Sequence, residues 1–276
     1  MPTSKVCGTI FRSLVFSTMT NRTTDRRLFS KAEVILRQFG IDCPDQIDLE
    51  IIAADLGAIV RYASLEGSEA RIVGNGERAI ITVASGGLRQ RQRFSIAHEI
   101  GHWVERHGRG GFLCGKDDIS PQNDQAKSTE AQANAFASQL VLPSYLFNPM
   151  VAGLPVTLDT AEKIGKEFQT SLTATAIKLV RSADRPALVV CHSQEKREWF
   201  VRGPSVPEEL WPAKELDSET VAFELLYSPD AQGKTAVRQV PGFRWLTGRG
   251  ALNCTVRAQS VKVADGMVVS VVVLEL

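Results

Sequence analysis

The sequence has few of the features that mark specialised classes of protein. Only 5 of its 276 residues are cysteine, and no two of them form a Cys-x-x-Cys pair. An odd number of widely spaced cysteines argues against a disulfide framework and is typical of a reducing compartment. No apolar run reaches the roughly 18 residues that a membrane helix needs. We therefore expect a cytoplasmic protein with no membrane partner.

The charge is also nearly balanced, with 32 Lys and Arg against 31 Asp and Glu. This balance excludes a strongly basic nucleic-acid coat and an acidic solvating tail. The 21 glycines and 12 prolines follow no period, which excludes collagen-like and low-complexity chains. At this length, with 43% hydrophobic residues, the chain can form two folded domains, each with its own core.

Residues 1–26 are predicted to be a disordered N-terminal extension. The segment Val6–Met19 resembles a signal peptide only faintly, because Arg12 interrupts its apolar part and no small-x-small cleavage site follows. A start at Met19 instead of Met1 is compatible with this pattern.

The stretch 27–152 is predicted to be an α+β domain. Apolar residues at helical spacing, together with capping residues, predict helices at 28–39, 49–56, 88–106, 128–142 and 143–150. Short β-branched segments predict a small antiparallel sheet from 58–63, 70–73 and 79–83. We expect Ala79–Val83 to be an edge strand to which an extended peptide substrate could add by backbone pairing.

The remaining chain is predicted to contain a helical pair and then a mainly β domain. Residues 153–184 carry two short helices around Gln169–Ser171 that resemble a helix-turn-helix. Residues 185–276 show strand patterns at 187–191, 199–201, 221–227, 235–240, 251–263 and 267–276. The fold class is therefore α+β.

The segment His98-Glu-Ile-Gly-His102 matches the H-E-x-x-H motif within a helical pattern. Residues four apart share one face of a helix, so both imidazoles can reach one metal ion while Glu99 stands beside them. A catalytic zinc site needs a third protein ligand. His107 points about 140° away around the helix from His102, and His192 belongs to the second domain, so we expect neither to be a ligand.

A carboxylate on the next helix is the better candidate for the third ligand. Glu130 lies among alanines that allow this helix to approach the motif helix closely, and Asn134 lies four residues later. Asn134 could therefore orient a metal ligand by a hydrogen bond. From spacing alone, Glu130 is equally well explained as a first-turn carboxylate that interacts with the helix dipole.

Two segments together resemble the ImmA/IrrE family of metallopeptidases: Arg93-Phe-Ser-Ile-Ala-His-Glu-Ile-Gly-His102 and Glu130-Ala-Gln-Ala-Asn-Ala-Phe-Ala-Ser-Gln-Leu-Val-Leu-Pro143. The resemblance spans about 28–181 and implies a zincin-like domain. It implies His98, His102 and Glu130 as the metal ligands, in a setting that includes Asn134. The layout of the chain also resembles the IrrE branch, with a GAF-like C-terminal domain that senses a signal or positions the substrate.

The resemblance implies a zinc endopeptidase that cleaves an XRE-type helix-turn-helix repressor in a stress or DNA-damage response. Zinc is the expected metal and manganese an alternative. Glu99 is the expected general base. Candidates for stabilising the oxyanion are Arg91, Arg93, Tyr145 and His107.

Two other functions stay open. A DNA-binding or sensory regulator with a structural metal site would not need Glu99, and an antitoxin or mobile-element partner would act by binding alone. We do not expect direct DNA binding, because the helical pair has a local charge of only about +2. Cys114 could form a redox-sensitive contact to the zinc, although a plain thiol explains it as well. The sequence leaves the oligomeric state open.

Overall fold

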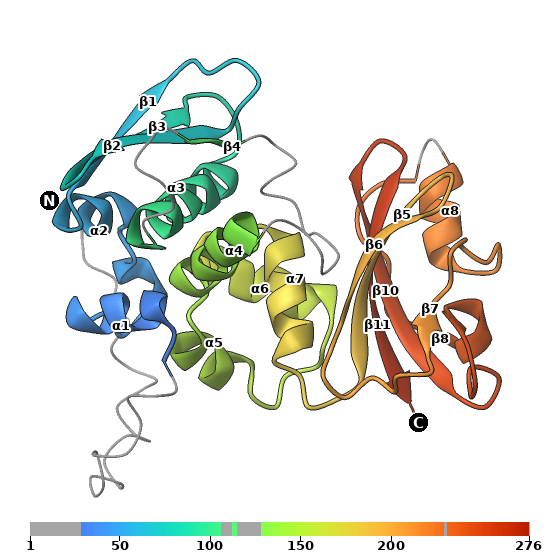
Figure 1. The fold of residues 1–276 in the computed structure, drawn as a ribbon. Helices are drawn as coiled ribbons and strands as arrows, with labels where there is room; N and C mark the ends of the chain where they lie inside the picture. The colour runs from blue at the N-terminus through green and yellow to red at the C-terminus, as the bar shows by residue number, and fades with distance from the viewer. Residues whose placement is uncertain (1–28, 106–111, 115–127, 229–230, 276) are drawn as a thin grey trace, which may run out of the picture.

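The structure is a computed structural model that describes residues 29–105, 112–114, 128–228 and 231–275. Its two larger sheets, of four and five strands, have a layer of helices between them (Figure 1). The predicted extension 1–26, His107 and the side chain of Cys114 lie outside the described residues. In the part of the chain that is described, no helix is long and apolar enough to cross a membrane.

The first sheet consists of β1 (Ala58–Ala63), β2 (Ala70–Asn75), β3 (Arg78–Ala84) and β4 (Phe112–Cys114), in the order β1-β3-β2-β4. β2 and β3 form an antiparallel hairpin, but β1 pairs with β3 in parallel. The expected all-antiparallel sheet is therefore wrong for one pair. The expectation that Ala79–Val83 is an edge strand is also wrong, because β3 lies between β1 and β2.

The parallel pairing arises where the chain enters β1. Gly57 adopts a φ of +84°, and a Cβ at this position would lie 2.5 Å from the carbonyl oxygen of Glu77. The carbonyl of Gly57 accepts a hydrogen bond from the amide of Ala79 at 3.0 Å. The beginning of β1 is therefore fixed beside the beginning of β3, so the two strands run in the same direction.

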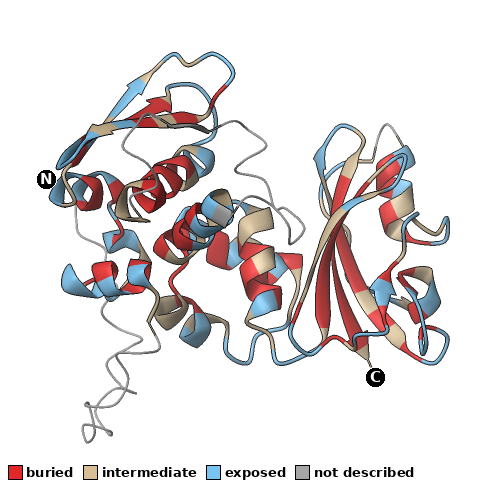
Figure 2. Cartoon of the chain, viewed as in Figure 1, coloured by how far each residue is buried: buried red, intermediate tan, exposed pale blue. Residues whose placement is uncertain are grey.

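Helices cover one face of this sheet. The helices expected in the first half of the chain are confirmed, and a short 3-10 turn, η1, is added: α1 (Lys31–Gln38), η1 (Pro44–Gln46), α2 (Leu49–Asp55), α3 (Arg89–Glu105), α4 (Ser128–Val141) and α5 (Ser144–Val151). Ser30 caps α1 in a capping box with Glu33, and Asp48 caps α2. Figure 2 shows buried residues along both α3 and α4; α3 packs against β2 and β3, and α4 packs against α3.

The expected helical pair is also confirmed, as α6 (Leu158–Phe168) and α7 (Leu172–Arg181). Thr157 and Ser171 are the N-caps. Gln169 ends α6 in the left-handed conformation, with a φ of 53°, which turns the chain sharply into α7. The two helices lie between α4 and the second sheet (Figure 1).

The second sheet is antiparallel, in the order β6-β5-β11-β10-β8. The elements of this half are β5 (Ala187–Ser193), β6 (Arg197–Arg202), β7 (Trp211–Pro212), α8 (Val221–Tyr227), β8 (Arg238–Pro241), η2 (Gly242–Arg244), β9 (Leu246–Thr247), β10 (Thr255–Ala264) and β11 (Met267–Glu275). The strand expected at 221–227 is wrong, because this segment is helix α8. Thr220 caps it, and it buries Ala222, Leu225 and Leu226 at helical spacing.

The core of the first half continues onto the second sheet. One cluster of buried apolar residues runs from α1 through α7 to one face of β5 and β11, and a second cluster fills the opposite face under α8. Gln259 of β10 accepts a hydrogen bond from the amide of Leu158 at 2.8 Å, so the sheet adds a hydrogen bond to the first turn of α6. The described chain is thus a mixed α+β structure. The domain boundaries at 152 and 184 stay a prediction.

Candidate metal centre

The site begins with the close packing of α3 against α4. Gly101 faces α4, and a Cβ added at Gly101 would lie 3.2 Å from the Cα and carbonyl oxygen of Ala133 and 3.3 Å from the Cβ of Phe136. Small residues at this crossing let the two helix backbones approach more closely than ordinary side chains would allow. The approach brings side chains of both helices into one buried space.

Three of the residues singled out from the sequence meet there. His98 Nε2 and His102 Nε2 lie 3.0 Å apart. Glu130 Oε2 lies 3.2 Å from His98 Nε2 and 3.4 Å from His102 Nε2. The exposed fractions of the side chains are 0% for His98 and 1% for His102, against 17% for Glu130. The two imidazoles are thus enclosed, and the carboxylate stands at the open side.

These distances fit a shared metal ion. Bonds of about 2.0–2.1 Å at tetrahedral angles separate two ligand atoms by roughly 3.3 Å. The three measured separations, 3.0, 3.2 and 3.4 Å, lie around that value. Two imidazole nitrogens and one carboxylate oxygen are also a ligand set typical of catalytic zinc, which keeps a fourth position open.

A hydrogen bond to Asn134 sets the orientation of one imidazole. Asn134 Oδ1 lies 3.1 Å from His98 Nδ1 and can only accept, so Nδ1 carries the proton and donates it. The Nε2 lone pair of His98 is then directed at the other two donor atoms. Such a bond to the far ring nitrogen is typical of metal-ligating histidines.

Glu99 follows His98 on the same helix and is fully buried, with an exposed fraction of 0%. The end of α3 is fixed to the rest of the domain by Trp103, whose indole N–H donates to the carbonyl of Leu56 at 2.7 Å. The structure therefore holds a carboxylate next to the His–His–Glu cluster on a rigid helix.

The candidates for oxyanion stabilisation have other partners. Arg91 pairs with Glu69 at 3.2 Å, Arg93 donates to the carbonyl of Ile47 at 3.2 Å, and Tyr145 donates its hydroxyl to the carbonyl of Ile41 at 2.8 Å. His107 lies outside the described residues. His192 is buried in β5, and its Nε2 lies 3.2 Å from the carbonyl of Ala213, so it is remote from the cluster.

Comparison with known proteins agrees with this geometry. Residues 53–180 match the family model of the IrrE N-terminal-like domain, Peptidase M78, which includes α3, α4 and the cluster. This part of the chain is similar to that family of metallopeptidase domains, and the resemblance drawn from the motifs is confirmed. No curated protein matches the sequence significantly.

A solved structure shares the fold. A protein described as a Mycobacterium tuberculosis transcriptional regulator superposes with a TM-score of 0.58 at 15% sequence identity, covering 88% of this chain and 74% of that one. At this level of identity the match shows similarity of fold alone. Because it covers most of both chains, it extends to the second sheet as well as to residues 53–180.

Proposed function

We propose that this chain is a zinc-dependent endopeptidase that regulates transcription by cutting an XRE-type helix-turn-helix repressor in a stress or DNA-damage response. The observation that carries the proposal is the convergence of His98, His102 and Glu130 within 3.4 Å inside an IrrE N-terminal-like domain. The solved structure of similar fold is described as a transcriptional regulator, and we propose the same broad role here.

Each residue of the site then has a chemical task. His98, His102 and Glu130 hold the metal, and Asn134 keeps His98 in the tautomer that can bind. A bound zinc ion supplies Lewis acidity, which makes water more acidic and polarises a carbonyl. Glu99 takes the proton of the attacking water and passes it to the leaving amine. Its burial beside the ligands suits this role, since a purely structural site has no need of a base.

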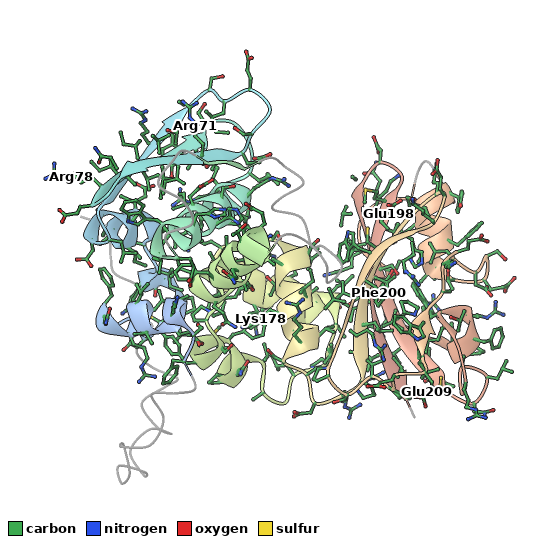
Figure 3. All side chains as sticks on the ribbon, in the orientation of Figure 1. Arg71, Arg78, Lys178, Glu198, Phe200 and Glu209 are labelled. Atoms are coloured by element: carbon green, nitrogen blue, oxygen red, sulfur yellow. The ribbon has the colours of Figure 1, made fainter. Side chains whose placement is uncertain are left out.

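The helices and sheet that follow the catalytic domain support the regulatory half of the proposal. We propose that the second sheet is a GAF-like domain that senses a signal or positions the repressor. The helical pair offers only a modest positive charge to DNA. Lys178, labelled in Figure 3, is buried with an exposed fraction of 7% and donates its Nζ to Ser144 Oγ at 2.7 Å, and Lys166 pairs with Glu162 at 3.0 Å. A repressor segment that adds to the first sheet has to pair with β1 or β4, the two edges.

The proposal is tested by incubating the zinc-loaded chain with the XRE-type repressor encoded nearby. Three proteins are compared: wild type, Glu99→Gln, and Glu105→Gln as a matched control on the same helix. Glu105 forms an ion pair with Lys31 and lies outside the cluster. We expect one discrete repressor fragment from wild type and Glu105→Gln and intact repressor with Glu99→Gln, although all three bind zinc.

If Glu99→Gln binds zinc normally and keeps the full effect on the repressor's target promoters, the chain is not acting as a peptidase. The function would then be that of a non-proteolytic regulator with a structural metal site, or of a protein that acts by binding its partner.

A further inference from the structure

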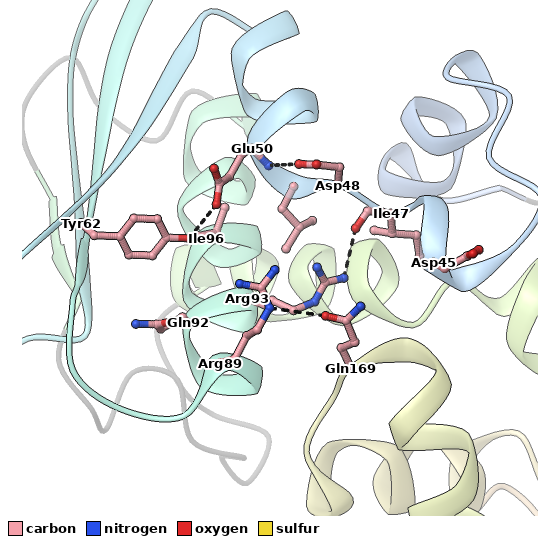
Figure 4. Close-up of a pocket in the computed structure, with 11 residues that line it drawn as sticks. Asp45, Ile47, Asp48, Glu50, Tyr62, Arg89, Gln92, Arg93, Ile96 and Gln169 are labelled. Atoms are coloured by element: carbon pink, nitrogen blue, oxygen red, sulfur yellow. Dashed lines mark hydrogen bonds between the residues drawn. The ribbon is translucent and has the colours of Figure 1, made fainter. Parts of the chain in front are cut away.

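A second cavity lies at the opposite end of the metal-binding helix. It has a volume of about 350 Å³ and is bounded by the first turns of α3, by α2 and by the turn between α6 and α7. Figure 4 shows the two guanidinium groups of Arg89 and Arg93 side by side in this cavity. None of the residues that line it belongs to the His–His–Glu cluster.

Arg93 is a buried charge that forms no ion pair among the described residues. Its exposed fraction is 7%, and one terminal nitrogen donates to the carbonyl of Ile47 at 3.2 Å. Its Nε is buried and has no hydrogen-bond partner in the described part of the chain. Burial first, and then the positive charge of Arg89, lower the pKa of Arg93, whereas the negative charge of Asp48 acts in the opposite direction. A buried, unpaired charge of this kind is costly unless a ligand of opposite charge completes it.

Arg89 lies one helical turn before Arg93 at the mouth of the cavity. Its Nε donates to Gln169 Oε1 at 3.5 Å, and within the described ranges it forms no ion pair. Gln169 reaches this position from the left-handed turn that ends α6. Two like charges four residues apart repel each other on a helix. An anion bound between the two guanidinium groups would offset this repulsion and could accept a hydrogen bond from Arg93.

Three carboxylates also line the cavity, those of Asp45, Asp48 and Glu50, and the last two have contacts of their own. Asp48 Oδ1 accepts the amides of Glu50 and Ile51 at 3.0 and 3.1 Å as the cap of α2. Glu50 Oε1 accepts the hydroxyl of Tyr62 at 2.7 Å. All three carboxylates are exposed, whereas Arg93 is buried. The two guanidinium groups lie side by side (Figure 4), so an anion that reaches Arg93 can also reach Arg89.

We propose that this cavity binds a phosphate group, either free phosphate or the phosphate of a small monoester. Two guanidinium groups offer paired N–H donors that match phosphate oxygens. The first turn of α3 adds the positive end of its helix dipole. The bound group would connect the metal-binding helix to the α6–α7 turn. This site is independent of the proposed peptidase activity.

The test is calorimetric titration of the full-length chain at constant ionic strength, with inorganic phosphate, glycerol 3-phosphate and acetate as probes. The variants are Arg89→Gln and Arg93→Gln, with Arg91→Gln as the matched control. Arg91 lies between the two on the same helix but pairs with Glu69. Arg89 is exposed, so its variant folds even if the loss of Arg93 disturbs the core.

We expect saturable binding of one phosphate by wild type and Arg91→Gln, and binding weaker by about tenfold or more in Arg89→Gln and Arg93→Gln. Tighter binding of glycerol 3-phosphate than of inorganic phosphate would identify a monoester, and the reverse order free phosphate. The proposal is overturned if wild type shows no saturable binding or acetate binds as well as phosphate. Unchanged affinity in Arg89→Gln also overturns it, because phosphate would then be bound elsewhere, for example at the metal.

Discussion

Replacing Gly101 by alanine tests whether the metal centre depends on the close approach of α3 and α4. The new methyl group would lie 3.2 Å from the Cα and carbonyl oxygen of Ala133, which is backbone and cannot rotate away. It would also lie 3.3 Å from the Cβ of Phe136. At these distances the neighbouring helix has to move by a few tenths of an ångström.

Two opposing effects set the change in stability. Crowding a packed core costs about 1–3 kcal/mol, whereas alanine in place of glycine within a helix contributes up to about 1 kcal/mol. We expect a net loss of about 1 kcal/mol in the free energy of unfolding. The effect on metal binding is more specific, because Glu130 on α4 has to stay within reach of His98 and His102 on α3. We expect zinc affinity to fall by roughly tenfold or more, as it does when a supporting contact is lost.

Competition with a chromophoric chelator measures the zinc affinity, and urea unfolding without metal measures the stability. Gly86→Ala is the control, because a Cβ at Gly86 meets nothing within 4 Å. We expect that control to stay within about 0.5 kcal/mol of wild type. If Gly101→Ala is more stable than wild type and binds zinc equally well, the close approach does not limit the geometry of the site.

Three further contacts give separate predictions. Asn134→Ala removes the acceptor of the Nδ1–H of His98, so chelator competition should show zinc affinity roughly 10–100-fold lower. Burial lowers the pKa of Lys178 from 10.5 to about 8. Between these pH values Lys178 is protonated in the unfolded chain but not in the folded one. The free energy of unfolding, measured in urea, should therefore rise with pH in wild type, and this rise should be absent in Lys178→Met. Gln259→Ala removes the hydrogen bond that β10 adds to the first turn of α6, beside the Thr157 cap, and should lower the free energy of unfolding by about 1 kcal/mol.

Each of these predictions has a result that contradicts it. Unchanged zinc affinity in Asn134→Ala, measured beside a substitution of the exposed Asn148, would show that the hydrogen bond does not orient the ligand. Equal pH slopes in wild type and Lys178→Met would mean that Lys178 is solvated. If Gln259→Ala has the same free energy of unfolding as wild type, the hydrogen bond between Gln259 and α6 does not stabilise the fold.

Local patterns predicted the helices well, because capping residues and apolar spacing act within one segment. Ser171, for example, caps α7 through a hydrogen bond from the amide of Ala174. Helix α8 was missed because Val221, Phe223 and Tyr227 favour a strand by composition. The signal was present in Thr220 as a cap and in Ala222, Leu225 and Leu226 on one helical face. The parallel pairing of β1 with β3 has no local signal, since it depends on a backbone contact between Gly57 and Ala79.

The two sites differ in how far the sequence could predict them. Residues four apart on one helix must share a face, so the motif alone predicted that His98 and His102 meet. Spacing could not choose Glu130 as the third donor, because its position depends on how α4 crosses α3; the family resemblance supplied that choice. The second cavity was not predicted, since Arg89 and Gln169 are 80 residues apart and meet only through packing.

X-ray absorption at the zinc edge, combined with metal analysis of the purified chain, tests the central claim most directly. We expect one zinc per chain, coordinated by two imidazole nitrogens and one carboxylate oxygen at about 2.0–2.2 Å. The imidazole signal should weaken in His98→Ala, and the metal content should fall in Glu130→Ala. A chain that binds no metal, or a zinc ion whose coordination is the same in wild type and both variants, would contradict the account.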